Sequence, residues 1–119
     1  MPFRTFTVAE AHSVAARVVE LGDRLVEVRA ELTERRAKSD VGPLAELKGL
    51  EAGLADLLDQ ILALEVQLKG WAPLLVDIAV EHEGRVVLFC LLEGDREIGW
   101  YHEVDHGFPG RRPLSHLGL

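Results

Sequence analysis

Two imidazoles and a carboxylate lie close together near the carboxyl end of the sequence. His102, Glu103 and His106 spell the His-Glu-x-x-His pattern of zinc proteases, in which two imidazoles one helical turn apart hold the ion and the glutamate activates water. Here His102 ends a run rich in Trp, Tyr and Ile that is typical of a strand, and a Gly-Phe-Pro-Gly loop follows at 107–110. In extended chain the two imidazoles would stand roughly 13 Å apart. We therefore reject the zinc-protease interpretation.

The same residues could instead contribute to a metal site. If the strands that carry Asp77, His82 and His102 share one face of a sheet, these side chains converge with Glu103 and Asp105. Imidazole and carboxylate ligands suit several divalent ions, but nothing in the spacing requires such a site. We therefore predict no cofactor and keep a divalent metal ion as an alternative. Its ligands would be His102, Glu103, Asp77 and His82.

Two arginines follow in a Gly-Arg-Arg-Pro loop. Guanidinium groups on a loop can hold a phosphate or a carboxylate of a ligand. In an acidic chain, Arg111 is more often expected to pair with a carboxylate of the protein, such as Asp105, Glu103 or Asp77, and so to fix the tail to the sheet. No catalytic residue is predicted. The candidate ligand-binding residues are His102, Glu103, Asp105, Arg111 and Asp77.

The composition is that of a soluble protein with one domain. The chain has 119 residues and a formal net charge of −7, and its length suits a single core. An acidic balance counts against a nucleic-acid partner. No apolar run approaches the roughly 18 residues that cross a bilayer, and the amino terminus leads directly into a charged amphipathic segment without a signal peptide. We expect a cytoplasmic protein with neither a nucleic-acid nor a membrane partner.

Two amphipathic segments predict a helical hairpin over residues 7–69. Thr7-Val-Ala-Glu10 matches a capping box, so the first helix begins just after its threonine and ends near Ser39. The second helix runs from about Pro43 to Lys69. Apolar residues recur in both at alternating spacings of three and four, which is a heptad pattern typical of antiparallel, coiled-coil-like pairing. They are Val14, Val18, Leu21, Leu25, Val28 and Leu32, then Leu47, Leu50, Leu54, Leu57, Ile61, Leu64 and Leu68.

The apolar surface of these helices is wider than one seam. The additional row consists of Ala15, Val19 and Val26 on the first helix and Leu58, Leu62 and Val66 on the second. A helix in a bundle needs such a broad face, whereas a simple pair needs only a stripe. The chain's own sheet could cover the row, but a short sheet does not cover an arm on the order of 45 Å long. We expect two hairpins to form a four-helix bundle in a homodimer.

The second half of the chain alternates as strands do. Leu74–Glu81, 86–92 and 97–104 read as three strands joined by turns at 82–85 and 93–96, which predicts an antiparallel meander over 74–104 and a tail at 105–119. The middle strand is apolar on both sides, so the helices cover one face and the tail or a partner subunit covers the other. Cys90 lies in this strand and is expected to be a small buried hydrophobe, not a nucleophile.

Several short motifs resemble the bacterial family catalogued as domain of unknown function 2203. They are Phe6-Thr7-x-x-Glu10-Ala11, Leu75-Val76-Asp77, Gly84-Arg85, Leu88-Phe89-Cys90, Trp100-Tyr101-His102-Glu103 and Gly107-Phe108-x-Gly110-Arg111-x-Pro113-Leu114. The resemblance implies a small cytoplasmic bacterial protein with no assigned activity. It also implies an imidazole and a carboxylate where His102 and Glu103 stand, without a histidine at the position of His106, which further weakens the protease interpretation.

We therefore predict a single α+β domain: a long antiparallel helical hairpin followed by a three-stranded antiparallel sheet. Because most apolar surface is organised for helix packing and no complete catalytic set appears, we favour a homo-oligomeric interaction or scaffold module over an enzyme. The alternative is a protein that binds a small anion or a divalent metal ion at the carboxyl-terminal edge of the sheet, with or without catalysis.

Overall fold

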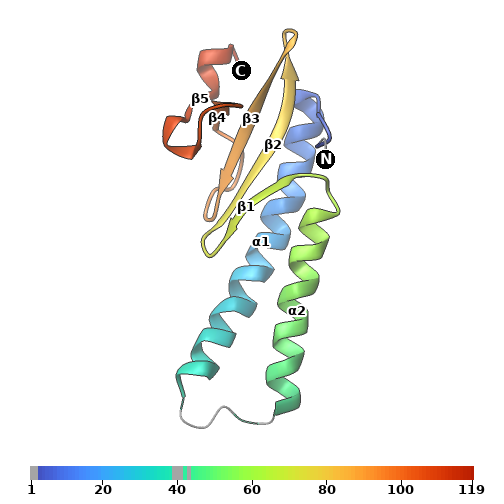
Figure 1. The fold of residues 1–119 in the computed structure, drawn as a ribbon, viewed down its shortest axis with the longest axis vertical. Helices are drawn as coiled ribbons and strands as arrows, with labels where there is room; N and C mark the ends of the chain where they lie inside the picture. The colour runs from blue at the N-terminus through green and yellow to red at the C-terminus, as the bar shows by residue number, and fades with distance from the viewer. Residues whose placement is uncertain (1–2, 39–41, 43) are drawn as a thin grey trace.

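Two helices precede a five-stranded antiparallel sheet in the computed structural model, which describes residues 3–38, 42 and 44–119. The prediction of an α+β fold is confirmed. Figure 1 shows α1 and α2 side by side and running in opposite directions, with the sheet packed against the half of the helices nearest the chain termini. The molecule is elongated, with extents of 55 × 23 × 23 Å. None of the described helices is long and apolar enough to cross a membrane.

Helix α1 spans Val8–Ala37 and begins at the predicted capping box. The Glu10 backbone N–H donates to the Thr7 hydroxyl at 3.1 Å, and the Thr7 N–H donates to the Glu10 carboxylate at 2.9 Å. These bonds satisfy backbone groups that the first helical turn leaves free. Helix α2 spans Leu44–Leu62. The predicted helix boundaries at Ser39 and Pro43 lie outside the described residues.

Helix α2 ends at Leu62, before the predicted Lys69, and a strand that was not predicted follows it. Glu65 has a positive φ of 65°, and strand β1 then spans Gln67–Trp71. Leu64 and Leu68 still pack against the core, but from a turn and a strand. Because both keep the spacing of the helical seam, their apolar pattern does not show where the helix ends.

The sheet has the strand order β1-β2-β3-β4-β5, with every neighbouring pair antiparallel. Strands β2 (Leu74–His82), β3 (Arg85–Leu92) and β4 (Trp100–Glu103) are the three that the sequence predicts. The predicted number of strands is wrong, because β1 and the short β5 (Arg112–Pro113) extend the meander at its two edges. Glu83 and Gly84 form the β2–β3 turn with φ values of 52° and 82°, the backbone sign that tight hairpin turns need.

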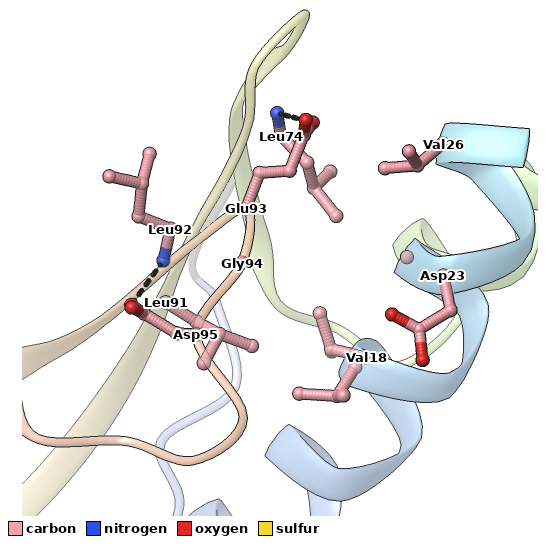
Figure 2. A pocket seen from close by; sticks show the side chains of 11 residues that line it. Val18, Asp23, Val26, Leu74, Leu91, Leu92, Glu93, Gly94 and Asp95 are labelled. Carbon is pink, nitrogen blue, oxygen red and sulfur yellow. Dashed lines mark hydrogen bonds between the residues drawn. The ribbon is translucent and has the colours of Figure 1, made fainter. Parts of the chain in front are cut away.

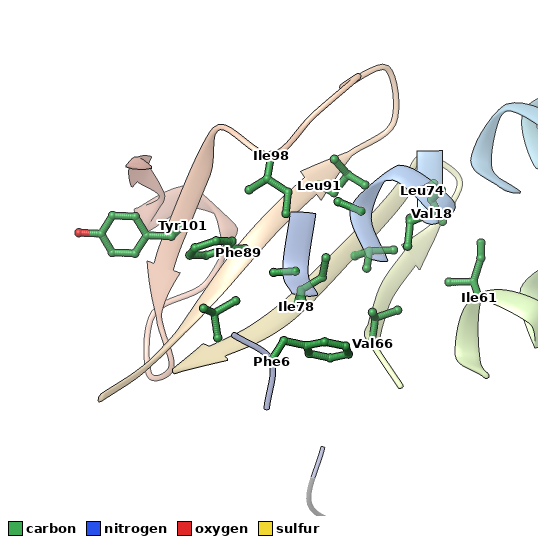
Figure 3. Packing of buried hydrophobic residues seen from close by; sticks show 14 of the residues in the cluster. Phe6, Val18, Ile61, Val66, Leu74, Ile78, Phe89, Leu91, Ile98 and Tyr101 are labelled. Carbon is green, nitrogen blue, oxygen red and sulfur yellow. The ribbon is translucent and has the colours of Figure 1, made fainter. Parts of the chain in front are cut away.

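The hydrophobic core lies between the helices and one face of the sheet. Figure 3 shows Ile61 of α2, Ile78 of β2 and Phe89 of β3 in this cluster. Much of the additional apolar row that the sequence predicts belongs to it: Ala15 of α1 and Val66, which lies between α2 and β1, are buried there, and Val19 and Leu58 pack against it. The predicted four-helix bundle is wrong, because the described chain contributes two long helices and its own sheet covers much of the row.

The opposite face of the sheet is also covered at its central strand, β3. Leu88 and Cys90 are buried on that side, and Phe108 of the tail lines a cavity together with Cys90. The tail, as predicted, supplies part of this cover. It contains two 3₁₀ turns, η1 (Phe108–Gly110) and η2 (Leu114–Leu117), and Leu114 turns back into the core on the helix side.

Candidate functional site

Three side chains able to bind a metal meet on the face of the sheet opposite the core. Asp77 of β2 pairs with Cys90 of β3, and Leu88 of β3 pairs with His102 of β4. Side chains directly opposite each other on antiparallel strands share a face, and residues two apart on one strand also do. The strand register therefore places Asp77, Cys90 and His102 together.

This cluster of Asp77, Cys90 and His102 is almost closed to solvent. The exposed fractions of the three residues are 3%, 2% and 4%. One possible ligand atom from each, a carboxylate oxygen, the Sγ and an imidazole nitrogen, lies within 4.8 Å of the other two. Asp77 and His102 are the buried residues with polar or charged side chains in the described part of the chain. A charge at such a place is costly unless it has a partner.

The hydrogen bonds of His102 show which ring nitrogen carries a proton. Nδ1 lies 2.8 Å from the backbone carbonyl oxygen of Glu103, which can only accept, so Nδ1 donates. Nε2 lies 3.0 Å from Oδ2 of Asp77. In the neutral ring Nε2 presents a lone pair to this oxygen, so the contact needs a proton on one of the two atoms. The second carboxylate oxygen of Asp77, Oδ1, is buried and has no hydrogen-bond partner among the described residues.

Cys90 lies in an environment that disfavours its ionised form. Burial raises the pKa of the Cys90 thiol, the negative charge of Asp77 raises it further, and the positive charge of Arg111 opposes the shift. The thiol Sγ lies 3.8 Å from the Leu88 carbonyl oxygen. The sequence predicts the burial of Cys90 but not its place in the cluster, because the cross-strand register with Asp77 leaves no signal in the local pattern.

The other sequence-predicted ligands lie elsewhere. The Glu103 side chain forms an ion pair with Arg85 at 2.9 Å. The His82 Nε2 lies 3.1 Å from the Leu117 carbonyl oxygen in the tail, and Asp105 is exposed in the turn after β4. Of the predicted metal ligands, the structure brings together Asp77 and His102, and it adds Cys90.

The zinc-protease spelling has no structural counterpart here. His102 lies in β4, whereas His106 is exposed in the following turn, where its backbone N–H donates to the Glu103 carbonyl oxygen at 3.0 Å. Residues 102–106 form the end of a strand and a turn, not the helix that would present both imidazoles to one ion.

Arg111 rests on aromatic rings. Its guanidinium carbon lies 4.2 Å from the centroid of Phe108 and 5.0 Å from that of Trp100. The predicted ion pair is not formed, because no carboxylate in the described ranges lies within ion-pair distance of Arg111. A cavity of about 50 Å³ adjoins these side chains. Its lining residues are Cys90, Leu92, Asp95, Trp100, Phe108 and Arg111.

A second small cavity, of about 30 Å³, lies between α1 and the end of β3. Figure 2 shows two of its carboxylates engaged with the backbone: Glu93 accepts from the Leu74 N–H and Asp95 from the Leu92 N–H, each at 2.9 Å. These bonds close the ends of β2 and β3. We assign this cavity a structural role and leave it out of the candidate site.

A protein-family model described as an uncharacterized conserved protein, DUF2203, matches residues 4–114. Comparisons with curated proteins and with solved structures find no match. The family match includes both helices, the sheet, the Asp77–Cys90–His102 cluster and Arg111. The chain therefore belongs to the DUF2203 family of uncharacterized conserved proteins.

Proposed function

We propose that the protein binds a divalent transition-metal ion such as Zn²⁺ through Asp77, Cys90 and His102. The observation that supports the proposal is the convergence of one oxygen, one sulfur and one nitrogen atom within 4.8 Å of one another at a buried place. Carboxylate, thiolate and imidazole are the ligand types that hold zinc in proteins.

The orientation of His102 suits a metal ligand. Its Nδ1–H is bonded to the Glu103 carbonyl oxygen, and its Nε2 faces Asp77. Metal-binding histidines usually donate their other ring N–H to a carbonyl or carboxylate, which selects the tautomer and holds the ring. A metal ion would take the place of the proton that the contact between Nε2 and Oδ2 otherwise requires.

Asp77 and Cys90 would each gain from a bound cation. The unpartnered Oδ1 of Asp77 is an acceptor of the kind that costs about 1–3 kcal/mol when left unsatisfied in a core. Cys90 must lose its proton to bind, and a coordinating cation favours the thiolate strongly enough to remove it. The cation would therefore satisfy the unpartnered oxygen of Asp77 and would offset the cost of ionising the buried thiol of Cys90.

Three protein ligands leave one position of a tetrahedral ion for water or for a ligand, as in catalytic zinc sites. Such a centre agrees in kind with the alternative prediction of a protein that binds a metal ion or a small ligand. It differs in its ligands, because Cys90 takes the place of Glu103 and His82.

Cobalt(II) titration of metal-free protein without a histidine tag tests the proposal. We expect one equivalent of Co²⁺ to bind with a thiolate-to-cobalt absorption band in the near ultraviolet. Cys90→Ser removes the band, and His102→Gln weakens binding by about tenfold or more, since even second-sphere changes have effects of that order.

The matched control is His106→Gln, which removes an exposed histidine from the same segment and leaves both the band and the affinity unchanged. Circular dichroism establishes that each variant is folded. Wild-type protein without the band, or a Cys90→Ser variant that retains it, overturns the metal assignment.

Self-association is the second candidate, in line with the homo-oligomeric module favoured by the sequence. The helices extend beyond the sheet (Figure 1), and Leu44 at the start of α2 is 66% exposed. We propose that a second copy of the chain contacts this part of α2, where Leu44 offers an exposed apolar side chain for helix–helix contact. Light scattering tests this candidate, because a dimer has twice the mass of the chain.

A further inference from the structure

We propose that Arg111 is an anion-binding subsite beside the metal centre, where it holds the carboxylate or phosphate group of a small ligand that also reaches the open metal position. This inference rests on the proposed metal site and names the class of ligand that the site takes. The juxtaposition that supports it is the shared cavity, which both Cys90 and Arg111 line.

The aromatic rings contact the guanidinium, whose N–H groups donate no hydrogen bond to any residue in the described ranges. Arg111 lies over Phe108 and Trp100 at 4.2 and 5.0 Å. Cation–π contacts of this kind use the positive charge of the guanidinium and do not consume its five N–H donors. No carboxylate of the described chain pairs with Arg111, so the planar fork remains available to the oxygens of a ligand.

Arg111 is the positively charged side chain that an anion in this cavity would meet. A divalent ion held by one thiolate and one carboxylate has no net charge, so Arg111 supplies the cationic group of the cavity. Asp95 also lines the cavity, and its charge opposes an anion. The Oδ2 of Asp95 accepts a hydrogen bond from the Leu92 N–H at 2.9 Å, and this bond partly compensates the negative charge. Two parallel N–H···O bonds from Arg111 are therefore the main attraction.

The size of the cavity limits what enters it. A water molecule needs at least about 10–15 Å³ of such space, so a cavity of about 50 Å³ admits a group the size of a few waters. A carboxylate or a phosphate group has this size, and the remainder of a larger ligand would lie outside. Inorganic phosphate and acetate are therefore suitable probes.

Isothermal titration of zinc-loaded protein with inorganic phosphate and with acetate tests the subsite. We expect wild-type protein to bind at least one of the two, and Arg111→Gln to weaken that binding by about tenfold or more, the loss of a charge-assisted bidentate contact. Arg111→Lys retains the charge without the fork and gives an intermediate affinity.

Arg112→Gln is the matched control. Like Arg111, Arg112 is exposed, but it lies on β5 in register with Tyr101 of β4 and does not line the cavity, so its replacement leaves the anion affinity unchanged. Cobalt titration of every variant keeps the two proposals separate. An Arg111→Gln variant that binds Co²⁺ like wild type but no longer binds the anion supports the subsite.

Equal anion affinity in wild type and Arg111→Gln overturns the inference. A loss of anion affinity in Arg112→Gln as large as that in Arg111→Gln also overturns it, as does zinc-loaded wild-type protein that binds neither phosphate nor acetate. If the wild type binds no Co²⁺, the proposed function fails. Phosphate titration of metal-free protein then tests Arg111 directly, and Arg111-dependent binding there supports the anion site while overturning its link to a metal.

Discussion

Asp77 and His102 lie on different strands, with β3 between them, yet their side chains meet over it: Oδ2 of Asp77 is 3.0 Å from Nε2 of His102. Both residues are nearly closed to solvent. The other ring nitrogen of His102 is engaged with the Glu103 carbonyl oxygen. A hydrogen bond between Oδ2 and Nε2 needs a proton on one of the two atoms, and in our proposal a metal ion takes the place of this proton.

Removal of Asp77 tests the energetic value of this contact in metal-free protein. Asp77→Ala leaves Nε2 of His102 buried without a partner, so we expect the free energy of unfolding to fall by about 1–3 kcal/mol. Urea unfolding followed by circular dichroism measures the change. His106→Gln, an exposed change in the same segment as His102, stays within about 0.5 kcal/mol of wild type. Equal effects of the two variants contradict the prediction.

The ion pair between Arg29 and Glu93 makes stability depend on pH. Arg29 donates to both carboxylate oxygens of Glu93, at 2.8 and 2.7 Å. The Arg29 hydrogen bonds, followed by the one from the Leu74 N–H, hold the pKa of Glu93 below its ordinary value of 4.5. The ionised carboxylate therefore stabilises the fold above the unfolded pKa, and this contribution is lost as the pH falls through the folded value.

Glu93→Gln should therefore lower the free energy of unfolding by about 1 kcal/mol at neutral pH, as expected for a bidentate pair near the surface. The difference from wild type should shrink once the pH falls below the ordinary glutamate pKa of 4.5. Urea unfolding at neutral and at acidic pH measures both values. Glu97→Gln, an exposed glutamate change, serves as the control. A difference that does not vary with pH argues against the assignment.

The capping box predicts a local contribution to stability. Thr7→Ala removes the hydroxyl that accepts the Glu10 N–H and should cost about 1 kcal/mol. Thr5→Ala changes a nearby exposed threonine outside the cap and should have little effect. Thermal or urea unfolding distinguishes the two variants, and an equally stable Thr7→Ala variant shows that the cap contributes nothing measurable.

Self-association through the helices stays a prediction with a direct test. Light scattering at micromolar concentration should give a mass near twice the 13.2 kDa of the chain. Leu44→Glu places a charge on an exposed apolar position of α2 and should shift the mass toward the monomer. Leu119→Glu alters an exposed leucine at the carboxyl end and should leave the mass unchanged. A monomeric wild type refutes the prediction.

Features with short-range causes are predicted well from this sequence. The capping box needs only Thr7 and Glu10, the alternation of strands β2 and β3 follows from their own side chains, and the turn at Glu83 and Gly84 is set by local backbone preferences. The position at which α2 ends is not determined by nearby residues in this way. Leu64 and Leu68 keep the helical spacing, but the pairing of β1 with β2 takes this segment out of the helix. That pairing depends on residues further along the chain.

The candidate site depends on contacts between residues distant in sequence. Asp77 and His102 are 25 positions apart, and Cys90 lies between them in a run that reads as an ordinary buried strand. The sequence predicts Asp77 and His102 as candidate ligands and Cys90 as a buried residue. Their convergence with Cys90, and the placement of Arg111 on two rings instead of a carboxylate, required the register of three strands and the path of the tail. Cross-strand register arises from packing of the whole sheet, so a local pattern cannot contain it.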